Sequence, residues 1–205
     1  MSILIDGLKE LQIKYTDDQI DLINEYIDEV MLFNPKYGLV NATGDTFVIK
    51  HILDSLAGVN PIKEIDPKSI ADVGSGGGFP GIPLAVFFPD VEFHLIERSG
   101  KRCNFLRNAV LTLGLKNVHI RESAVEQIKE KFDLVTFRAF TPMEVPITTC
   151  LLGLLNKTGL IFAYKGREGT IAEELKVIAG LVETSKLIAT KVPFLPDERN
   201  FLILQ

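Results

Sequence analysis

Several glycines lie in one short stretch of the chain, between a β-branched run that ends in an acid and a second apolar run. They stand at Gly74, Gly76, Gly77, Gly78 and Gly81. The order of strand, glycine turn and helix start lets a backbone approach a ligand closely, because free N–H groups face outward at a helix N-terminus. A glycine turn without a ligand is disfavoured at such a strand-to-helix junction. The spacing therefore predicts a small-molecule site.

Two cofactor classes fit this turn. Gly76, Gly78 and Gly81 match the G-x-G-x-x-G of dinucleotide sites, a weak signal on its own. Gly74, Gly76 and Gly78 also fit the D-x-G-x-G-x-G turn of methyltransferases that use S-adenosylmethionine. Asp72 separates the two, because its carboxylate would repel a pyrophosphate but suits the ammonium end of a methionine. We favour S-adenosylmethionine, held by Asp72, Gly74, Gly76 and Gly78.

Polar residues also follow three later strands of the predicted sheet. Glu97 closes the second strand, where a carboxylate accepts hydrogen bonds from ribose hydroxyls. Ser123–Glu126 follows the third strand, where methyltransferases commonly hold adenine. Arg138 follows the fourth strand and faces the position of the transferable methyl group. Each position has a plain structural alternative. Glu97 could be a solvated acid at a strand end, Ser123–Glu126 an ordinary helix N-terminus, and Arg138 a member of a strand-end ion pair.

Basic side chains cluster directly after Glu97, with no acid between them. The cluster comprises Arg98, Lys101, Arg102 and Arg107. Lys165 after the fifth strand and Arg199 before the last strand are expected near the same rim. Clustered ammonium and guanidinium groups beside a cofactor site suit a phosphate backbone, whereas a solvated helix face is the alternative. These positions are equally compatible with RNA binding and with a plain charged surface.

The composition limits the remaining possibilities. The 205 residues are 46% hydrophobic, enough to bury the core of one domain, and the formal charge of −5 argues against a general nucleic-acid coat. No apolar run approaches the ~18 residues of a membrane span. The two cysteines form no C-x-x-C pair, which suits a reducing cytoplasm, and the three histidines show no metal-ligand spacing, so no metal is expected.

The elements that would position these residues fall into two groups. Helices are expected over 3–11, over 16–33 behind the capping box Thr16–Gln19, and over 47–59, with Asn34-Pro35 ending the second. From Ser69 the pattern alternates between strand and helix. The expected strands are 69–73, 91–97, 118–121, 132–137, 160–164, 182–192 and 201–204, the last two antiparallel, and the expected helices are 82–88, 101–113, 143–155 and 170–181.

Alternation of strand and helix with short connections indicates an open α/β sheet with parallel strands and helices on both faces. The first 60 residues precede that sheet and read as helical. We therefore expect a helical N-terminal extension over residues 1–60 and a Rossmann-like domain over residues 61–205, packed as one unit. In such a sheet, ligands bind beyond the carboxyl ends of the strands near the switch point.

Taken together, these motifs resemble one family closely: the bacterial small-subunit (16S) rRNA guanine-N7 methyltransferases, also called glucose-inhibited division protein B. The matching segments are His51–Leu56 (HILDSL), Asp72–Pro83 (DVGSGGGFPGIP), Gly100–Leu106 (GKRCNFL), Arg138-Ala139, Lys165-Gly166 and Glu198-Arg199. The glycine motif marks only the superfamily, whereas the segments on either side of it are more specific. The chain departs from the family at Tyr37–Asn41 (YGLVN, usually Tyr-Asn-Leu-Thr) and at Phe137, usually a small residue.

The resemblance implies a class I methyltransferase fold, S-adenosylmethionine as cofactor and a guanine of small-subunit ribosomal RNA as substrate. Carried over by position, the cofactor residues are Gly74, Phe79, Val125, Glu126 and Arg138. The residues expected near the RNA are His51, Lys101, Arg102, Lys165 and Arg199, together with Arg98 of the basic cluster. The expected partner is small-subunit rRNA or the small ribosomal subunit, met by a monomer in the cytoplasm.

Guanine N7 carries a lone pair and no proton, so methyl transfer to it requires no general base. Phe137–Phe140 accordingly lacks the N/D-P-P-Y-like tetrad of amine methyltransferases, and Cys150 lies in an apolar helical run typical of an inert thiol. We expect catalysis by alignment of the reactants, with Arg138 as a positioning residue. The alternatives are a small-molecule methyltransferase, a non-catalytic RNA-binding domain of the same fold and, less favoured, an NAD-dependent oxidoreductase.

Overall fold

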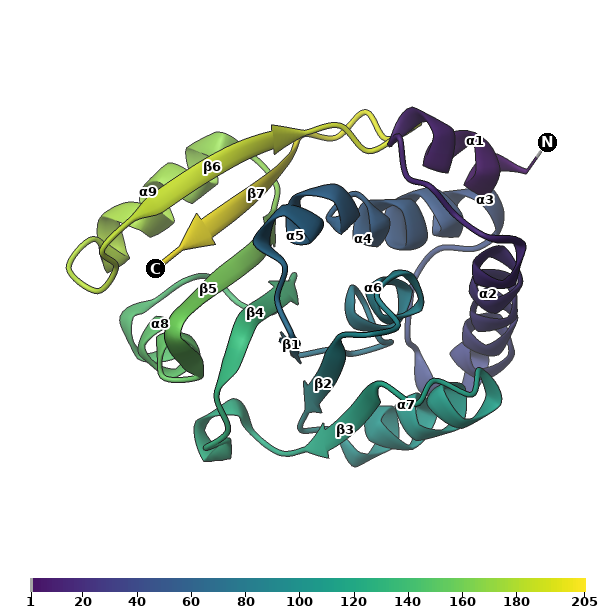
Figure 1. The fold of residues 1–205 in the computed structure, drawn as a ribbon, viewed down its shortest axis with the longest axis horizontal. Coiled ribbons are helices and arrows are strands. Elements are labelled where there is room, and N and C mark those ends of the chain that lie inside the picture. The colour runs from purple at the N-terminus through teal and green to yellow at the C-terminus, as the bar shows by residue number, and fades with distance from the viewer. Residues whose placement is uncertain (1) are drawn as a thin grey trace.

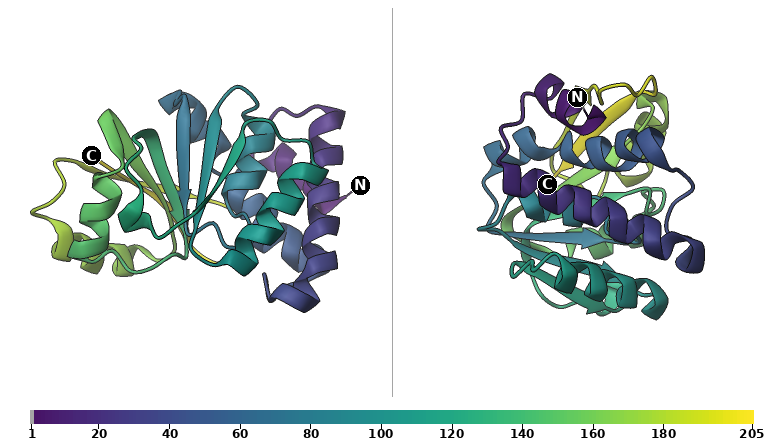
Figure 2. Two further views of the ribbon diagram at one scale, coloured as in Figure 1. Left: turned by 90° about the horizontal axis from the view of Figure 1, so that it is seen from below. Right: turned by 90° about the vertical axis from the view of Figure 1, so that its right-hand side faces the viewer.

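The computed structural model describes residues 2–205 and shows a seven-stranded sheet between two layers of helices (Figures 1 and 2). The strand order is β3-β2-β1-β4-β5-β7-β6. Strands β1 to β5 are parallel, and β7 runs antiparallel to both β5 and β6. The bounds are β1 Ser69–Val73, β2 Glu92–Glu97, β3 Val118–Glu122, β4 Phe132–Arg138, β5 Leu155–Lys165, β6 Ser185–Thr190 and β7 Arg199–Leu204.

The order of the strands reverses between β1 and β4. A ligand crevice is expected outside the carboxyl ends of the strands at such a switch point. The glycine turn follows β1, and Arg138 ends β4. The predicted open α/β sheet with parallel strands and helices on both faces is confirmed, as are the antiparallel closing strands.

Alternation along the strands produces two separate apolar layers. In β2, for example, Phe93 and Leu95 belong to one buried cluster and Ile96 to the other. Successive side chains of a strand point to opposite faces, so each strand contributes to both layers. Helices α6 (Gly81–Phe87) and α7 (Gly100–Thr112) cover the first face. Helices α8 (Val145–Leu152) and α9 (Glu168–Ile178) and the 3-10 turn η2 (Val125–Gln127) contribute to the second cluster.

The N-terminal helices form a further layer over α6 and α7 (Figure 2). They are α1 Ile3–Glu10, α2 Asp17–Tyr37, α3 Gly44–Phe47, the π-helical segment η1 Val48–Leu53, α4 Asp54–Leu56 and α5 Val59–Ile65. Helix α2 packs on α6 and α7, and α1 packs on η1. Leu8 and Ile23 of this layer share one buried cluster with Ile70, Ile82 and Phe201 of the sheet and its helix. The apolar core therefore crosses the expected boundary at residue 60.

Two expectations about the N-terminal helices were wrong. Helix α2 does not stop at Asn34-Pro35 but runs to Tyr37, and Gly38 ends it in the left-handed region (φ 62°). The lost N–H of Pro35 removes only one hydrogen bond near the helix end, while Phe33 and Tyr37 stack across it at 5.7 Å. The expected helix over 47–59 is instead a run of α3, η1 and α4, followed by α5.

None of the helices within residues 2–205 combines the length and the apolar character needed to span a membrane.

Candidate active site

The turn after β1 has a backbone that side chains other than glycine rarely adopt. Gly74, Gly76 and Gly78 have φ of 72°, 58° and 94°, all in the left-handed region. The N–H groups of Gly74 and Ser75 donate to the carbonyl of Ile96, which fixes the turn to the end of β2. A Cβ added at Gly74 would overlap the ring of Phe140. The glycines therefore allow both the turn and the close approach of another group.

Asp72 lies beneath this turn and is fully buried. Its Oδ2 accepts a hydrogen bond from the backbone N–H of Gly81 at 3.0 Å, at the start of α6. Its Oδ1 is buried and has no hydrogen-bond partner among the described residues. Burial raises the pKa of Asp72 to about 7, although the hydrogen bond from Gly81 opposes the rise. An unpaired carboxylate oxygen below the turn is consistent with a ligand that carries a positive group.

Tyr26 of α2 supports the turn from the other side. Its hydroxyl is buried and donates to the carbonyl of Gly77, and its ring packs 5.5 Å from that of Phe79. The rings of Phe47 and His51 also lie within 6 Å of Phe79, at 5.9 and 5.1 Å. The N-terminal helices therefore build the wall against which the glycine turn is held.

A first cavity of about 430 Å³, here called the glycine-turn cavity, opens beside Gly74. Its lining includes Gly74, Glu97, Arg98, Arg102, Val125 and Glu126. Glu97 is buried, and its two carboxylate oxygens accept hydrogen bonds from the backbone N–H groups of Gly76 (3.0 Å) and Ser99 (2.8 Å). Arg102 approaches the same carboxylate at 3.7 Å. The expected ribose and adenine positions thus share one cavity.

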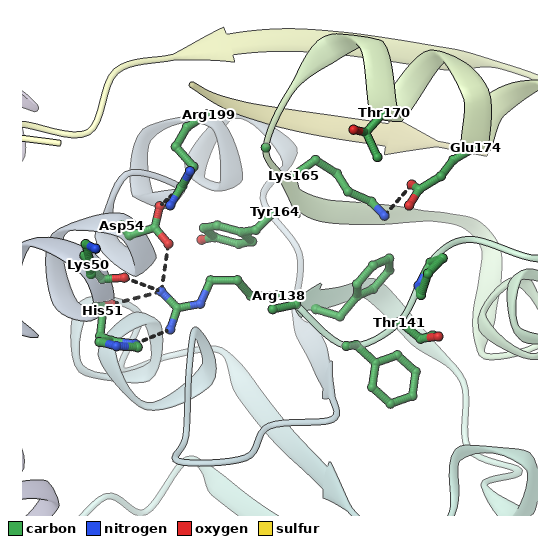
Figure 3. Close-up of a pocket in the computed structure, with 15 residues that line it drawn as sticks. Lys50, His51, Asp54, Arg138, Thr141, Tyr164, Lys165, Thr170, Glu174 and Arg199 are labelled. Carbon is green, nitrogen blue, oxygen red and sulfur yellow. Dashed lines mark hydrogen bonds and ion pairs between the residues drawn. The ribbon is translucent and has the colours of Figure 1, made fainter. Parts of the chain in front are cut away.

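A second cavity of about 660 Å³, here called the arginine cavity, contains Arg138 and the side chains around it (Figure 3). Arg138 Nη1 lies 2.8 Å from Asp54 Oδ2 and donates to the carbonyls of Lys50 and His51. Its guanidinium also lies over the ring of Phe79, 5.1 Å from the centroid. Arg138 is thus fixed from the N-terminal layer, with 13% of its side chain exposed.

Asp54 joins two arginines that are far apart in the sequence. One carboxylate oxygen contacts Arg138, and the other accepts from Arg199 Nε at 3.0 Å. The side chain of Asp54 is only 6% exposed, so the two guanidinium groups compensate its buried charge. Asp54 was named only as part of a motif, because its partners lie on β4 and β7 and no local spacing reveals them.

His51 faces Arg138 on the same side of the cavity. Its Nδ1 lies 3.1 Å from Arg138 Nη2. Burial, and then the adjacent guanidinium, lower the pKa of His51 to about 4. The ring is therefore neutral at physiological pH, and Nδ1 accepts a hydrogen bond from Arg138, which leaves the proton on Nε2.

The two cavities meet at Ala139, Phe140 and Thr141, which line both of them. Ala139 has a φ of 50°, unusual for a residue other than glycine. This backbone places the ring of Phe140 over Gly74, between the cavities. Phe140 was expected only as one of the aromatic residues on either side of Arg138, and its contact with the glycine turn was not foreseen.

The predicted residues fall into three places. Gly74, Glu97, Val125 and Glu126 line the glycine-turn cavity. Asp72, Gly78 and Phe79 are buried in the support of the turn, and Gly76 is part-buried within it. His51, Arg138, Lys165 and Arg199 line the arginine cavity. Arg98 and Arg102 lie in the glycine-turn cavity rather than beside Lys165 and Arg199, and Lys101 lies outside both, with Nζ 5.4 Å from the centre of the Tyr37 ring.

The basic cluster after Glu97 is also less free than its sequence indicates. Arg107 forms an ion pair with Glu122 at 2.7 Å, and Arg102 faces Glu97. The expected single rim is therefore divided between the two cavities, with Lys101 outside both. The acids that pair with Arg102 and Arg107 come from β2 and β3, and only the sheet register brings them to the cluster.

Solved structures of known proteins share this fold. An O-methyltransferase from Bacillus cereus, in complex with S-adenosylhomocysteine, superposes with a TM-score of 0.65 over 100% of this chain and 98% of that chain, at 14% identity. An O-methyltransferase from Klebsiella pneumoniae gives a TM-score of 0.63 over 99% and 96%, also at 14% identity. At these identities the likeness supports the fold alone.

Sequence similarity is more specific. A family model described as rRNA small subunit methyltransferase G matches residues 19–202. Proteins named Ribosomal RNA small subunit methyltransferase G from Borrelia duttonii and Treponema denticola are both 37% identical to this chain. They cover 97% and 99% of it, and the aligned parts make up 94% and 93% of those proteins. The resemblance seen in the sequence is confirmed, and the chain belongs to the rRNA small subunit methyltransferase G family.

Proposed function

We propose that this protein transfers a methyl group from S-adenosylmethionine to N7 of a guanine in small-subunit ribosomal RNA. One observation carries the proposal: two cavities of different chemistry meet at Ala139–Thr141, beside the carboxyl ends of β1 and β4. One cavity offers a glycine turn and a buried carboxylate, and the other offers arginine, lysine and histidine side chains. A cofactor and a nucleotide would meet at the shared loop.

The glycine-turn cavity has donor and acceptor groups that suit S-adenosylmethionine. The carboxylate of Glu97 would accept from the ribose hydroxyls, and Val125-Glu126 would flank the adenine. Asp72, with its unpaired buried oxygen, would favour the ammonium group of the methionine end. The absence of side chains at Gly74 and Gly76 allows close backbone approach. Each of these residues was expected in this role from the sequence.

S-adenosylmethionine, when bound, supplies a methyl group already activated on a sulfonium. The protein's own residues then have only to bind, orient and exclude water. Guanine N7 has no proton to remove, and neutral His51 is engaged as an acceptor of Arg138. Arg138 is held by Asp54 and by two carbonyls, which suits a rigid positioning group. Alignment of this kind can contribute ~7–11 kcal/mol to lowering the barrier.

The proposed substrate also suggests where and how the protein works. Small ribosomal subunits lie in the cytoplasm, so we place the protein there. We also propose that the protein acts as a monomer. With a net charge of −5, contacts from one small basic surface would make RNA affinity strongly salt-sensitive.

The decisive experiment maps 7-methylguanosine in 16S rRNA from cells with and without this protein. We expect one guanine to lose its N7 methyl group in the deletion strain. Purified protein should then restore it on small subunits from that strain, with tritiated S-adenosylmethionine as donor. An unchanged methylation map, or transfer to small molecules of a cell extract but not to rRNA, would contradict the proposal.

A further inference from the structure

An ion pair of unassigned role lies in the arginine cavity, across from Arg138 (Figure 3). It joins Lys165, at the end of β5, to Glu174 in α9, with Nζ 2.6 Å from Oε2. The two side chains are only 11% and 14% exposed. Lys165 also lies 5.5 Å from the centre of the Phe137 ring. Lys165 was expected near the RNA phosphates, whereas no role was expected for Glu174.

Stability alone is a poor explanation for this pair. Removal of two charges from water costs about as much as their attraction returns, and apolar substitutes of similar volume are often as stable. The described structure gives the ammonium one hydrogen bond, to Glu174, and gives the carboxylate one, from Lys165. An ammonium has three donors and a carboxylate about four lone-pair sites, so most of their hydrogen-bonding capacity is available to the cavity.

The pattern of donor and acceptor matches one edge of guanine. Its Watson–Crick edge presents N1–H and N2–H₂ as donors and O6 as an acceptor. A carboxylate accepts from the two nitrogens, while an adjacent ammonium donates to O6. Adenine presents the opposite pattern, with an acceptor at N1 and a donor at N6. Glu174 and Lys165 together would thus accept guanine and leave adenine with mismatched groups, which costs far more than loss of a neutral contact.

The position of the ion pair would also leave the reactive atom, N7, accessible. N7 lies on the edge of the purine away from N1 and N2, so a base held by its Watson–Crick edge keeps N7 free. Lys165 and Glu174 face Arg138 and Asp54 across the cavity, and Phe140 lies at the boundary with the glycine turn (Figure 3). A base bound in this way would leave N7 free to face the loop that the two cavities share. The Phe140 ring offers it an apolar surface to stack on.

We propose that the Lys165–Glu174 ion pair reads the Watson–Crick edge of the target guanine and so determines base specificity. This inference rests on the proposed function, because it takes guanine N7 as the methyl acceptor. It assigns Glu174 to the two nitrogen donors and Lys165 to O6.

The test replaces the target guanosine by inosine, which lacks only the N2 amino group and keeps N1–H, O6 and N7. Small subunits are reconstituted with 16S rRNA ligated from fragments so that the mapped position carries guanosine or inosine. The wild-type protein should methylate the inosine subunit with a kcat/KM roughly 10–100-fold lower, as expected for loss of a hydrogen bond to a charged group. Glu174→Ala should methylate both subunits at the same, reduced rate.

Glu173→Ala is the matched control, because Glu173 is adjacent on α9 but 72% exposed and pairs with Lys176. It should keep the full preference for guanosine. Glu174→Gln preserves side-chain volume and should show a reduced preference, which covers the case in which the alanine variant fails to fold. Affinity for S-adenosylhomocysteine, measured by calorimetry, should not change in any of the three variants.

Equal wild-type rates on guanosine and inosine would overturn the inference, as would an inosine penalty of unchanged size in Glu174→Ala and Glu174→Gln. A purely structural role for the ion pair would lower activity on both subunits and leave the penalty intact. Absence of wild-type methyl transfer to the guanosine subunit would instead overturn the proposed function itself, and so distinguishes the two failures.

Discussion

At the scale of single residues, Asp54 connects the two sides of the site. It is buried and contacts both Arg138 and Arg199, from β4 and β7. The attraction of two guanidinium groups compensates the cost of burying the Asp54 carboxylate. Without Asp54, the charges of Arg138 and Arg199 would be less well compensated in the cavity. Asp54 therefore fixes the orientation of Arg138 in the arginine cavity.

Replacement of Asp54 by Asn should show this dependence. We expect Asp54→Asn to lower the free energy of unfolding by roughly 3 kcal/mol, because two arginines lose a buried partner. It should also reduce kcat for methyl transfer. Asp66→Asn is the control, since it breaks the exposed pair with Lys68 and should cost at most about 1 kcal/mol. Urea unfolding and single-turnover kinetics provide the measurements. Equal stability losses in both variants would contradict this role.

The raised pKa of Asp72 predicts that stability and cofactor affinity depend on pH. Its pKa of about 7 in the folded protein lies above its ordinary value of 3.8, so the folded state binds the proton more tightly over that range. Its contribution to stability is therefore present at low pH and is lost as the pH rises through 7. A bound ammonium would favour the ionised form. Affinity for S-adenosylhomocysteine should thus increase, roughly tenfold at most, between pH 6 and pH 8.

Calorimetry across that range measures the effect, and Asp72→Asn should abolish it. His51 does not interfere, because its pKa of about 4 keeps it neutral from pH 6 to pH 8. Asp66→Asn again serves as the control and should retain the wild-type slope. A slope that survives in Asp72→Asn would show that another group carries the pH dependence.

These residues show what local sequence contains and what it lacks. The glycine turn and Glu97 were located because each lies at the end of its own strand, so that residue type and position can both be read from the local sequence. Asp54 and Glu174 were not, because each acquires its role from a partner on a distant strand. The ion pair between Arg107 and Glu122 was missed for the same reason, since Glu122 reaches Arg107 only through the register of β3.

At the scale of elements, the unit of β1, the glycine turn and α6 was predictable almost to the residue. Its strand alternation and its glycines act locally, and the structure places the strand at Ser69–Val73 as expected. The π-helical segment η1 was not predictable, because its hydrogen-bond pattern differs from that of an α-helix without a distinct sequence pattern. Such segments are often found at functional sites, and the carbonyls of Lys50 and His51 in η1 accept from Arg138.

The turn can be tested with two glycines of similar backbone. Gly74 and Gly114 both have positive φ, 72° and 63°, so alanine strains each by roughly 1–2 kcal/mol. Only at Gly74 does the added methyl group meet another residue, Phe140, beside the glycine-turn cavity. Gly74→Ala should therefore abolish detectable binding of S-adenosylhomocysteine, while Gly114→Ala should bind it normally. If the two variants unfold at similar temperatures and bind S-adenosylhomocysteine with equal affinity, a cofactor does not bind at this turn.

At the scale of the whole molecule, the N-terminal layer is part of the site rather than an addition to it. Tyr26 holds the glycine turn, Asp54 holds Arg138, and the carbonyl of Ser55 accepts from the hydroxyl of Tyr164. Together with the shared apolar core, these contacts favour one cooperative unit. The division into residues 1–60 and 61–205 stays a prediction about sequence organisation, and we expect the two parts to unfold together.

Charge is the other property of the whole molecule that decides how it meets RNA. A net charge of −5 repels a polyanion, so productive approach depends on local positive charge at the edge of the site. Lys101 and Lys116 allow a balanced comparison, because both are exposed and flank opposite ends of α7. Lys101 follows the carboxyl end of β2 on the side of the cavities, whereas Lys116 precedes the amino end of β3.

Lys101→Glu and Lys116→Glu change the net charge by the same two units, so any general repulsion is equal in both. We expect Lys101→Glu to weaken binding to small subunits and to reduce the slope of log affinity against log salt by about 0.7–0.9, the loss of one phosphate contact. Lys116→Glu should keep the wild-type slope. Titrations of labelled subunits at several salt concentrations measure both. If the two variants weaken equally with parallel slopes, net charge rather than the edge of the site governs RNA binding, and Lys101 has no phosphate contact.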